Sequence, residues 1–213
     1  MRRALEMIIA TLGLLILSPV FVVIAIAIKL DDGQPVFYKQ PRVGKAFRAF
    51  HIYKFRSMIP GSDRGGLLTA PEDARLTRVG KTLRRLKLDE LPQLFNLLMG
   101  DMQLVGPRPE VARYVERFYT EYQQLLQDRP GITDPATLMY RREDKMFIVK
   151  SLEEQYISQI VPNKLRISLA YQKRRDARSD LKIVVKTVFC LGAFSPPNKP
   201  NKYEDSSEVM EGR

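Results

Sequence analysis

The feature that most constrains this chain is an uncharged apolar run near its start, from Met7 to Ile28. Its length is sufficient for a membrane helix, because about 20 apolar residues cross the hydrocarbon core of a bilayer. Arg2 and Arg3 precede the run, and Ala25-Ile26-Ala27 resembles a signal-peptidase site, so a cleaved signal peptide is one alternative. The run is longer than the apolar part of a typical signal peptide, and secreted products normally contain more cysteine. We therefore expect a membrane anchor.

The pair Ser18-Pro19 lies near the middle of this anchor. Proline lacks a backbone N–H and clashes with the carbonyl four residues back, here Leu15, so a helix should break or kink there. The Ser18 hydroxyl is placed to supply a partner to a freed carbonyl. Each half of the run would then be about 15 Å long, which is half of a hydrocarbon core.

Positive residues flank the run on both sides. They are Arg2 and Arg3 before it, and Lys29, Lys39, Arg42 and Lys45 after it. The positive-inside tendency places both ends in the cytoplasm. A helix-break-helix over residues 1–30 that enters and leaves through the same leaflet satisfies this charge pattern and the proline. A kinked helix that crosses the whole bilayer is the alternative.

The net charge narrows the classes of partner. At +11, with a pI of about 9.8, the chain should attract polyanions: nucleic acid, anionic lipid headgroups or phosphorylated small molecules. The charge is spread along the chain, so a generally basic surface is the alternative, and no standard nucleic-acid motif is present, so we predict no nucleic-acid partner. The single Cys190 excludes an internal disulfide, and the single His51 has no second histidine for a zinc site.

After Gly33 the pattern favours an α/β fold that is mostly helical around a small sheet. Residues 35–40 and 46–58 are rich in β-branched and aromatic side chains and predict a β-hairpin, with residues 41–45 as its turn. Residues 60–66 predict a loop. Apolar residues recur at helical spacing from Pro71, and a second helix is expected to begin at Asp89 or Glu90, with Pro92 in its first turn.

The rest of the chain predicts further helices. Residues 100–110 form a loop with a short strand or turn, and helices are expected over 111–127, 151–159 and 163–177. Residues 182–194 mix lysines with apolar side chains and predict a helix in the membrane interface, with a buried core helix as the alternative. The final segment, 195–213, has the composition of a disordered tail.

A long motif then determines the function that we expect. The run "RLTRVGKTLRRLKLDELPQLFNLLMGDMQLVGPRPE", residues 75–110, resembles the signature of the bacterial monotopic phosphoglycosyl transferases, a family of sugar transferases. "PVFYKQPRVGK", "YKFRSM" and "RPGIT" follow the order of that family, and the likeness covers roughly residues 5–195. It resembles the short form of the family, with a catalytic domain over residues 31–194.

The resemblance implies a reaction and its place. A sugar 1-phosphate would pass from a UDP-sugar to a polyprenol phosphate, such as undecaprenyl phosphate, with release of UMP. This would be the first membrane step of glycoconjugate assembly, at the cytoplasmic face of the bacterial inner membrane. Enzymes that act later in such assembly are candidate partners. By position, Asp89 would be the nucleophile that forms a covalent phosphosugar intermediate, and Glu90 its partner near a required Mg²⁺.

Elementary chemistry agrees with these roles. A carboxylate can attack phosphorus only when the negative charge of the diphosphate is offset by Mg²⁺ and cations. Adjacent acids such as Asp89 and Glu90 can hold Mg²⁺ near the phosphate while one attacks. A helix that begins at these residues would also direct free N–H groups at the anion. Without the surrounding motif, the acid pair would be interpreted as a solvated helix start.

Basic residues complete the predicted site. Arg84 resembles the phosphate-binding arginine of the family, and Arg85 would lie on the outer face. Lys54 and Arg56 alternate onto one face of the predicted strand, where they could meet phosphates; a solvated face is the alternative. Pro107-Arg108-Pro109 resembles the loop that the family associates with the nucleotide, since its prolines would hold the arginine in place; a simple turn is the alternative.

The identity of the sugar stays open. Asp134 stands where many relatives carry glycine, and "TLMYRRED" follows where they differ widely. Two other functions also remain: a membrane-bound phosphohydrolase of nucleotide sugars, with water as acceptor, and a membrane-anchored basic adaptor. The adaptor would leave the Asp89-Glu90 pair without a role.

Overall fold

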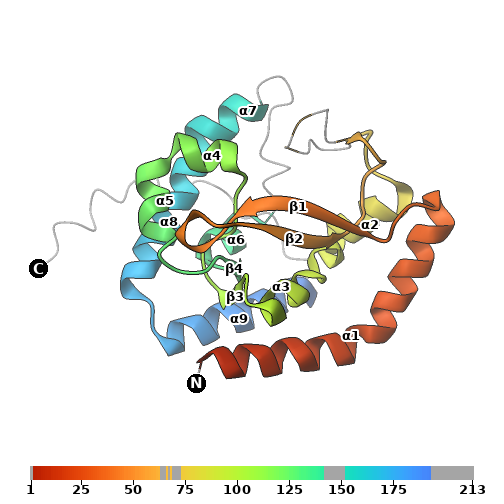
Figure 1. Cartoon of the computed structure of the whole chain (residues 1–213), viewed down its shortest axis with the longest axis horizontal. Helices are drawn as coiled ribbons and strands as arrows, with labels where there is room; N and C mark the ends of the chain where they lie inside the picture. Colours follow the sequence, from red (N-terminus) through yellow and green to blue (C-terminus); the bar gives the residue numbers. More distant parts are fainter. Residues whose placement is uncertain (1, 63–65, 67, 69–72, 142–151, 193–213) are drawn as a thin grey trace, which may run out of the picture.

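Most of the described chain is helical, and two small sheets lie among the helices (Figure 1). The computed structural model describes residues 2–62, 66, 68, 73–141 and 152–192. In chain order its elements are α1 (Arg2–Asp32), β1 (Phe37–Val43), β2 (Ala49–Phe55), α2 (Arg78–Leu86), α3 (Gln93–Met99), β3 (Gln103–Val105), α4 (Ala112–Arg117), α5 (Tyr119–Leu125), β4 (Gly131–Thr133), α6 (Pro135–Met139), α7 (Leu152–Gln155), α8 (Val161–Arg174) and α9 (Ala177–Gly192).

The apolar N-terminal run forms one helix, α1, which contains Pro19 and bends sharply near its middle (Figure 1). The predicted break is therefore a bend within a single helix. The hydroxyl of Ser18 donates to the carbonyl of Leu15 at 2.8 Å, which confirms the predicted partner. Within the described residues, α1 alone is long and apolar enough to cross a membrane by length and composition, and only 11% of its most apolar window is buried.

The predicted hairpin is confirmed, but its turn lies further along the chain. Strands β1 and β2 pair antiparallel from Phe37 opposite Phe55 to Val43 opposite Ala49. The turn runs through a 3₁₀ segment at Lys45–Phe47 instead of residues 41–45. Pro41 is paired within β1, and β1 is an edge strand, the position in a sheet where proline is tolerated.

The motif segment is helical on both sides of the acid pair. Helix α2 begins after Thr77, whose hydroxyl accepts from the N–H of Gly80 at 2.9 Å, and it ends at Lys87, which is left-handed with φ 59°. A 3₁₀ turn at Leu88–Glu90 follows, and α3 begins only at Gln93. The prediction that an α-helix begins at Asp89 or Glu90 is wrong, since the two acids lie in the turn before it.

A second sheet brings two motif segments together. Strands β3 and β4 are parallel, with Gln103 opposite Gly131 and Val105 opposite Thr133. A side chain on Gly131 would lie 2.1 Å from the backbone nitrogen of Gly106, so only glycine fits this approach. The short strand within residues 100–110 is confirmed, whereas β4 and α6 were not predicted.

The later helices differ from the predictions mainly in their boundaries. The helix predicted over 111–127 is divided at Phe118 into α4 and α5. One helical stretch covers most of the two helices predicted separately over 151–159 and 163–177. It consists of α7, a π-helical turn at Tyr156–Ile160 and α8. Helix α9 begins at Ala177, before the predicted 182, and the tail at 195–213 lies outside the described residues. Exposed apolar side chains on α9 are Leu181, Val185, Val188 and Phe189.

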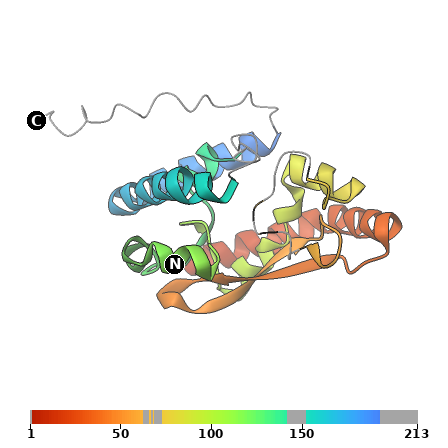
Figure 2. The same cartoon turned by 90° about the horizontal axis from the view of Figure 1, so that it is seen from above.

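Two apolar clusters hold these elements together. One joins α4, α5 and α8 through Tyr114, Leu125 and Leu165. In the other, Ile24 and Ile28 of α1 pack with Phe55, Leu83 and their neighbours, so the second half of α1 lies against the hairpin and α2. Figure 2 shows α1 and the hairpin on one side of the molecule and α8 on the other.

Candidate active site

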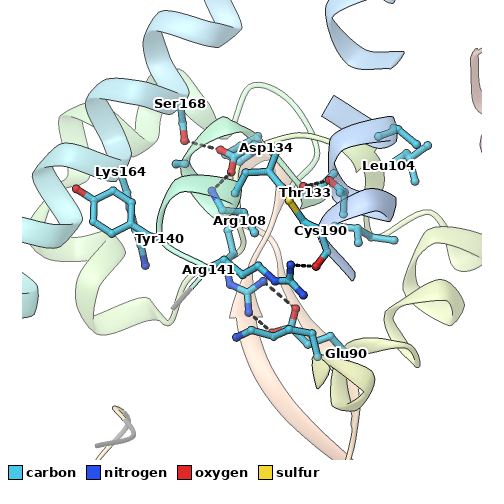
Figure 3. Close-up of a pocket in the computed structure, with 18 of the residues that line it drawn as sticks. Glu90, Leu104, Arg108, Thr133, Asp134, Tyr140, Arg141, Lys164, Ser168 and Cys190 are labelled. Carbon is cyan, nitrogen blue, oxygen red and sulfur yellow. Dashed lines mark hydrogen bonds and ion pairs between the residues drawn. The ribbon is translucent and has the colours of Figure 1, made fainter. Parts of the chain in front are cut away.

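A cavity of about 360 Å³ lies between α1, α3, α9 and the β3–β4 pair (Figure 3). Much of its wall is apolar. The apolar side chains include Ile9 and Leu17 of α1, Leu91 and Leu94, Leu104, Ile132, and Val184 and Val188 of α9. Its polar lining includes Lys87, Glu90, Arg108, Asp134, Arg141 and Lys164. A ligand with an apolar chain and a charged head would match this distribution.

The carboxylate of Glu90 and the guanidinium of Arg108 meet at this cavity (Figure 3). Nη1 of Arg108 donates to Oε2 of Glu90 at 3.1 Å, and Nη2 donates to Oε1. Paired bonds of this kind fix orientation as well as charge. The two residues come from the turn before α3 and the loop after β3, so the ion pair joins the acid pair to the Pro-Arg-Pro segment.

Asp89 lies beside this ion pair and is only 5% exposed. Its Oδ1 has no hydrogen-bond partner among the described residues. A buried carboxylate oxygen without a partner is costly, so such an atom indicates a place for a ligand. Burial raises the pKa of Asp89, and the charge of Glu90 raises it further, while Lys54 acts in the opposite direction.

The electrostatic surroundings of Glu90 differ from those of its neighbour. Burial acts to raise the pKa of Glu90, but the charges of Arg108 and Lys54 outweigh burial and hold this pKa well below its usual value. Adjacent acids with pKa values pushed in opposite directions are typical of sites where two carboxylates have different roles. Glu90 therefore stays ionised as the partner of Arg108, and Asp89 is the more basic carboxylate.

Lys54 belongs to the same group of charges. Burial lowers its pKa to about 8, and the positive charges of Arg108 and Arg42 contribute, against the acids Glu90 and Asp89. The structure thus places Lys54 where its charge acts on both acids, and its contact with phosphates stays a prediction. A pKa of about 8 means that this amine begins to lose its charge just above neutral pH.

The two predicted arginines outside the loop have different positions. Nε of Arg84 donates to the hydroxyl of Ser57 at 3.0 Å, and its charge favours the ionised form of Asp89. Arg56 lies past the end of β2, where its Nε donates to the carbonyl of Pro35 at 2.8 Å. The structure thus brings Arg84 near the acids but gives Arg56 a contact with the segment before β1.

A neighbouring acid, Glu110, supports the Pro-Arg-Pro loop, and sequence reasoning missed it. Its carboxylate accepts from Nη1 of Arg42 at 2.7 Å and from the hydroxyl of Tyr156 at 2.7 Å. Arg42 also reaches the carbonyl of Pro109 at 3.3 Å. Because β1, the loop and the π-helical turn converge here, the backbone beside Arg108 is held from two sides.

Asp134 has a structural position at the edge of the cavity. It is 1% exposed, accepts from the N–H of Thr137 at 2.7 Å as the N-cap of α6, and accepts from the hydroxyl of Ser168 at 2.6 Å (Figure 3). The Asp-Pro pair at the start of a helix is a local signal from which this cap could have been found. In the variable segment that follows, the residues after Arg141 lie outside the described part.

The described residues contain no group of three or more His, Cys, Asp or Glu side chains that could hold a metal ion. The acid pair supplies oxygen donors, which Mg²⁺ prefers, and Mg²⁺ commonly binds one or two carboxylates together with substrate phosphates. The buried free oxygen of Asp89 fits that kind of shared site. Asp89 and Glu90 are therefore the residues that could hold Mg²⁺ with a diphosphate.

Comparison with known proteins identifies the family of this chain. Residues 1–193 match the family model described as "Bacterial sugar transferase". The chain belongs to the bacterial sugar transferase family. The match includes α1, the acid pair, the Pro-Arg-Pro loop and α9, so the whole cavity lies within the part of the chain that matches the family model.

Curated relatives in this family have closely related names. The chain is 36% identical over 197 residues, 89% of its length, to the UDP-glucose:undecaprenyl-phosphate glucose-1-phosphate transferase of Escherichia coli (strain K12). It is 43% identical over 145 residues, 65% of its length, to the UDP-N-acetylgalactosamine-undecaprenyl-phosphate N-acetylgalactosaminephosphotransferase of Aeromonas hydrophila. The matched regions span 39% and 34% of these relatives, respectively.

Proposed function

We propose that this sugar transferase moves a sugar 1-phosphate from a UDP-sugar to undecaprenyl phosphate or a similar polyprenol phosphate, and releases UMP. Family membership and the activities that the relatives' names state support the reaction class. The observation with most weight is the buried Asp89 beside the Glu90–Arg108 ion pair: its pKa is raised, and its Oδ1 has no hydrogen-bond partner in the described part of the chain.

The proposed chemistry has two steps that share one covalent intermediate on Asp89. A carboxylate oxygen of Asp89 forms a bond to the phosphorus that bears the sugar, and the bond from that phosphorus to the oxygen of UMP breaks. An oxygen of the polyprenol phosphate then attacks the same phosphorus, and the Asp89 carboxylate leaves. Both substrates are anions, so a covalent intermediate avoids holding them together at one site. No proton has to be transferred in either step.

Each charged neighbour has a defined task in this scheme. Asp89 must be ionised to attack, and Lys54 and Arg84 favour that form. Glu90 holds the guanidinium of Arg108 in a fixed direction, where it can bind a phosphate oxygen. Mg²⁺ bound by Asp89 and Glu90 would offset charge on the diphosphate. The cations thus lower the repulsion between an acid nucleophile and an anionic substrate.

The lining of the cavity supports a lipid acceptor. Its α1 and α9 walls are apolar, and its polar lining contains Glu90 and Arg108. A polyprenol phosphate has the same division into an apolar chain and a charged head. Exposed apolar side chains on α1 and α9 beside the cavity would face lipid.

The contacts of α1 support a re-entrant arrangement at the cytoplasmic face of the membrane. Near the start of α1, Nη2 of Arg3 donates to the carbonyl of Leu98 at 2.7 Å. Near the end of α1, Asp31 accepts from the N–H of Val79 at 2.9 Å. Both ends therefore contact the same globular part, and the bend at Pro19 lets one helix do so. A helix across the whole bilayer would have to give up one set of contacts.

A panel of UDP-sugars with Mg²⁺ and undecaprenyl phosphate tests the proposal. We expect one of the nucleotides to yield UMP and a lipid-linked sugar phosphate. With that nucleotide alone, intact mass should increase by one phosphosugar, and peptide mapping should place it on Asp89. Free sugar phosphate formed without the lipid would instead identify a phosphohydrolase. Absence of UMP across a panel of hexoses, N-acetylhexosamines and diamino sugars would contradict the proposal.

A further inference from the structure

The first turns of α1 contain two charged residues that contact the globular part. Arg3 lies against the last turn of α3: its Nη1 donates to the carbonyl of Leu97 at 2.5 Å and its Nη2 to that of Leu98 at 2.7 Å. Carbonyls in the last turn of a helix have no backbone N–H partner within that helix, and a cation beside them is favourable. A side chain on Gly100 would come within 2.9 Å of Nη2, so this glycine leaves room for the guanidinium.

Glu6 makes the second set of contacts and is only 4% exposed. Its Oε1 accepts from the N–H of Leu104 at 3.3 Å, and its Oε2 lies 3.6 Å from Nη2 of Arg129 and 3.9 Å from Nη1 of Arg3. Leu104 is the central residue of β3. The N–H of Gln103, the residue before it, bonds to the carbonyl of Pro130 next to β4, and successive N–H groups of a strand point to opposite edges, so Glu6 meets the other edge of β3.

The two elements that α1 contacts in this way are those that lead to the Glu90–Arg108 ion pair. Helix α3 follows directly after the turn that holds Glu90, and β3 ends three residues before Arg108. Arg3 therefore binds the far end of one element, and Glu6 binds the edge of the other. The ion pair of 3.1 Å joins the same two elements at the cavity.

We propose that Arg3, Glu6 and Arg129, the N-terminal clamp, are positioning residues that set the spacing between α3 and β3. By setting this spacing, the clamp aligns Glu90 with Arg108. The alignment therefore depends on how α1 lies against the globular part. The next turns of α1 supply Ile9, Gly13 and Leu17 to the cavity wall, so the clamp also fixes one side of the binding space. This inference rests on the proposed function, because its consequence is catalytic.

The clamp is tested in the full-length protein in lipid nanodiscs, with the UDP-sugar that the panel identifies. The variants are Glu6→Gln, which removes the charge at nearly constant shape, Arg3→Ala and Arg3→Lys. Arg113→Gln is the matched control, since it breaks the exposed Arg113–Glu153 ion pair of 2.7 Å far along the chain. The rate of phosphosugar attachment to Asp89 is measured at saturating nucleotide, together with thermal unfolding and membrane association.

We expect Glu6→Gln and Arg3→Ala to slow attachment about tenfold or more, because small misplacements of reacting groups are costly. Both should remain folded and membrane-bound, the KM for the nucleotide should change little, and Arg113→Gln should match the wild type. Arg3→Lys, which keeps the cation, should recover part of the rate. Unchanged attachment rates in folded Glu6→Gln and Arg3→Ala would overturn the inference.

A double-mutant cycle separates positioning from simple stabilisation. If the clamp acts through Arg108, the losses from Glu6→Gln and Arg108→Lys should be clearly less than additive in the attachment rate. Additive losses would contradict this.

Hydrogen exchange gives a readout that needs no turnover: Glu6→Gln should increase exchange in peptides covering 88–99 and 103–108, and Arg113→Gln should not. If the wild type forms no adduct with any nucleotide, the proposed function fails, while exchange still decides the clamp: unchanged exchange would refute it.

Discussion

The guanidinium of Arg108 makes two hydrogen bonds to the carboxylate of Glu90, across 18 residues of sequence. In the proposed mechanism, this relationship gives the two adjacent acids different roles. Glu90 is held ionised by the cations around it, whereas Asp89 is buried, has a raised pKa and has an oxygen to which none of the described residues donates. A more basic carboxylate is a better nucleophile once it is ionised, so the geometry favours Asp89 for attack and Glu90 for alignment.

Asp89→Asn should abolish turnover and phosphosugar attachment, because an amide oxygen cannot replace the carboxylate nucleophile. The protein should remain folded and membrane-bound, since this substitution preserves shape and removes a buried charge. Intact mass after incubation with the UDP-sugar measures attachment, and Glu116→Gln, on an exposed part of α4, is the charge control. Substantial turnover in Asp89→Asn would exclude a covalent role for this residue.

Glu90→Gln should reduce turnover on the order of 10²-fold, because Arg108 loses the charge that fixes its direction. The substitution should also shift the pH dependence of the attachment rate in a defined direction. The charge of Glu90 raises the pKa of Asp89, so its removal should lower that pKa and move the acid limb of the attachment rate to lower pH. Attachment rates from pH 4 to 8 measure both effects. An acid limb that moves to higher pH would show that Glu90 does not act on Asp89 in this way.

The pKa of Lys54 predicts where the attachment rate falls on the alkaline side of its pH profile. Burial lowers its pKa to about 8, so the amine loses its charge as pH rises through that value, and the phosphate repulsion it offsets returns. We expect attachment to fall above about pH 8. In Lys54→Arg the guanidinium stays charged, so the limb should move to higher pH even if the maximal rate falls. A limb that stays in place in Lys54→Arg would assign it to another group.

The sequence predicted the local parts of this site, and the contacts between distant segments came from the structure. The hairpin, α2 and the acid pair follow from short-range patterns. The predicted hairpin turn lies too early in the sequence because Pro41 and Gly44 resemble turn residues, although Pro41 is tolerated on an edge strand. Neither the Glu90–Arg108 pair nor the contact of Glu6 with Leu104 has a local signal, since each joins segments that only the fold brings together.

Asp134 should contribute to stability through two bonds. Asp134→Ala removes the N-cap of α6 and the acceptor of the Ser168 hydroxyl, so the free energy of unfolding should fall by about 1–3 kcal/mol. Ser168→Ala removes only one of these bonds and should cost less. Chemical unfolding in a mild detergent measures both variants. Equal stability of Asp134→Ala and the wild type would leave Asp134 without the structural role inferred here.

The arrangement of α1 predicts which side of the membrane its first residues occupy. In a Cys190→Ser background, Arg2→Cys should resist an impermeant thiol reagent in intact cells and react once the cells are opened. Labelling from outside intact cells would show that α1 crosses the bilayer. The wild-type bend should be necessary for this result, because without it the run from Met7 to Ile28 could straighten to about 33 Å, close to a full hydrocarbon core.

Pro19→Leu in the same background tests that requirement. Leucine restores the missing N–H, so part of the protein should become reactive from outside. The contacts of Arg3 with α3 oppose this change, and adding Arg3→Ala should therefore increase the outside fraction further. Measurement of labelled and unlabelled protein by intact mass gives both fractions. If neither Pro19→Leu nor the double variant changes labelling, the bend does not determine the topology, and the positive residues that flank α1 must do so.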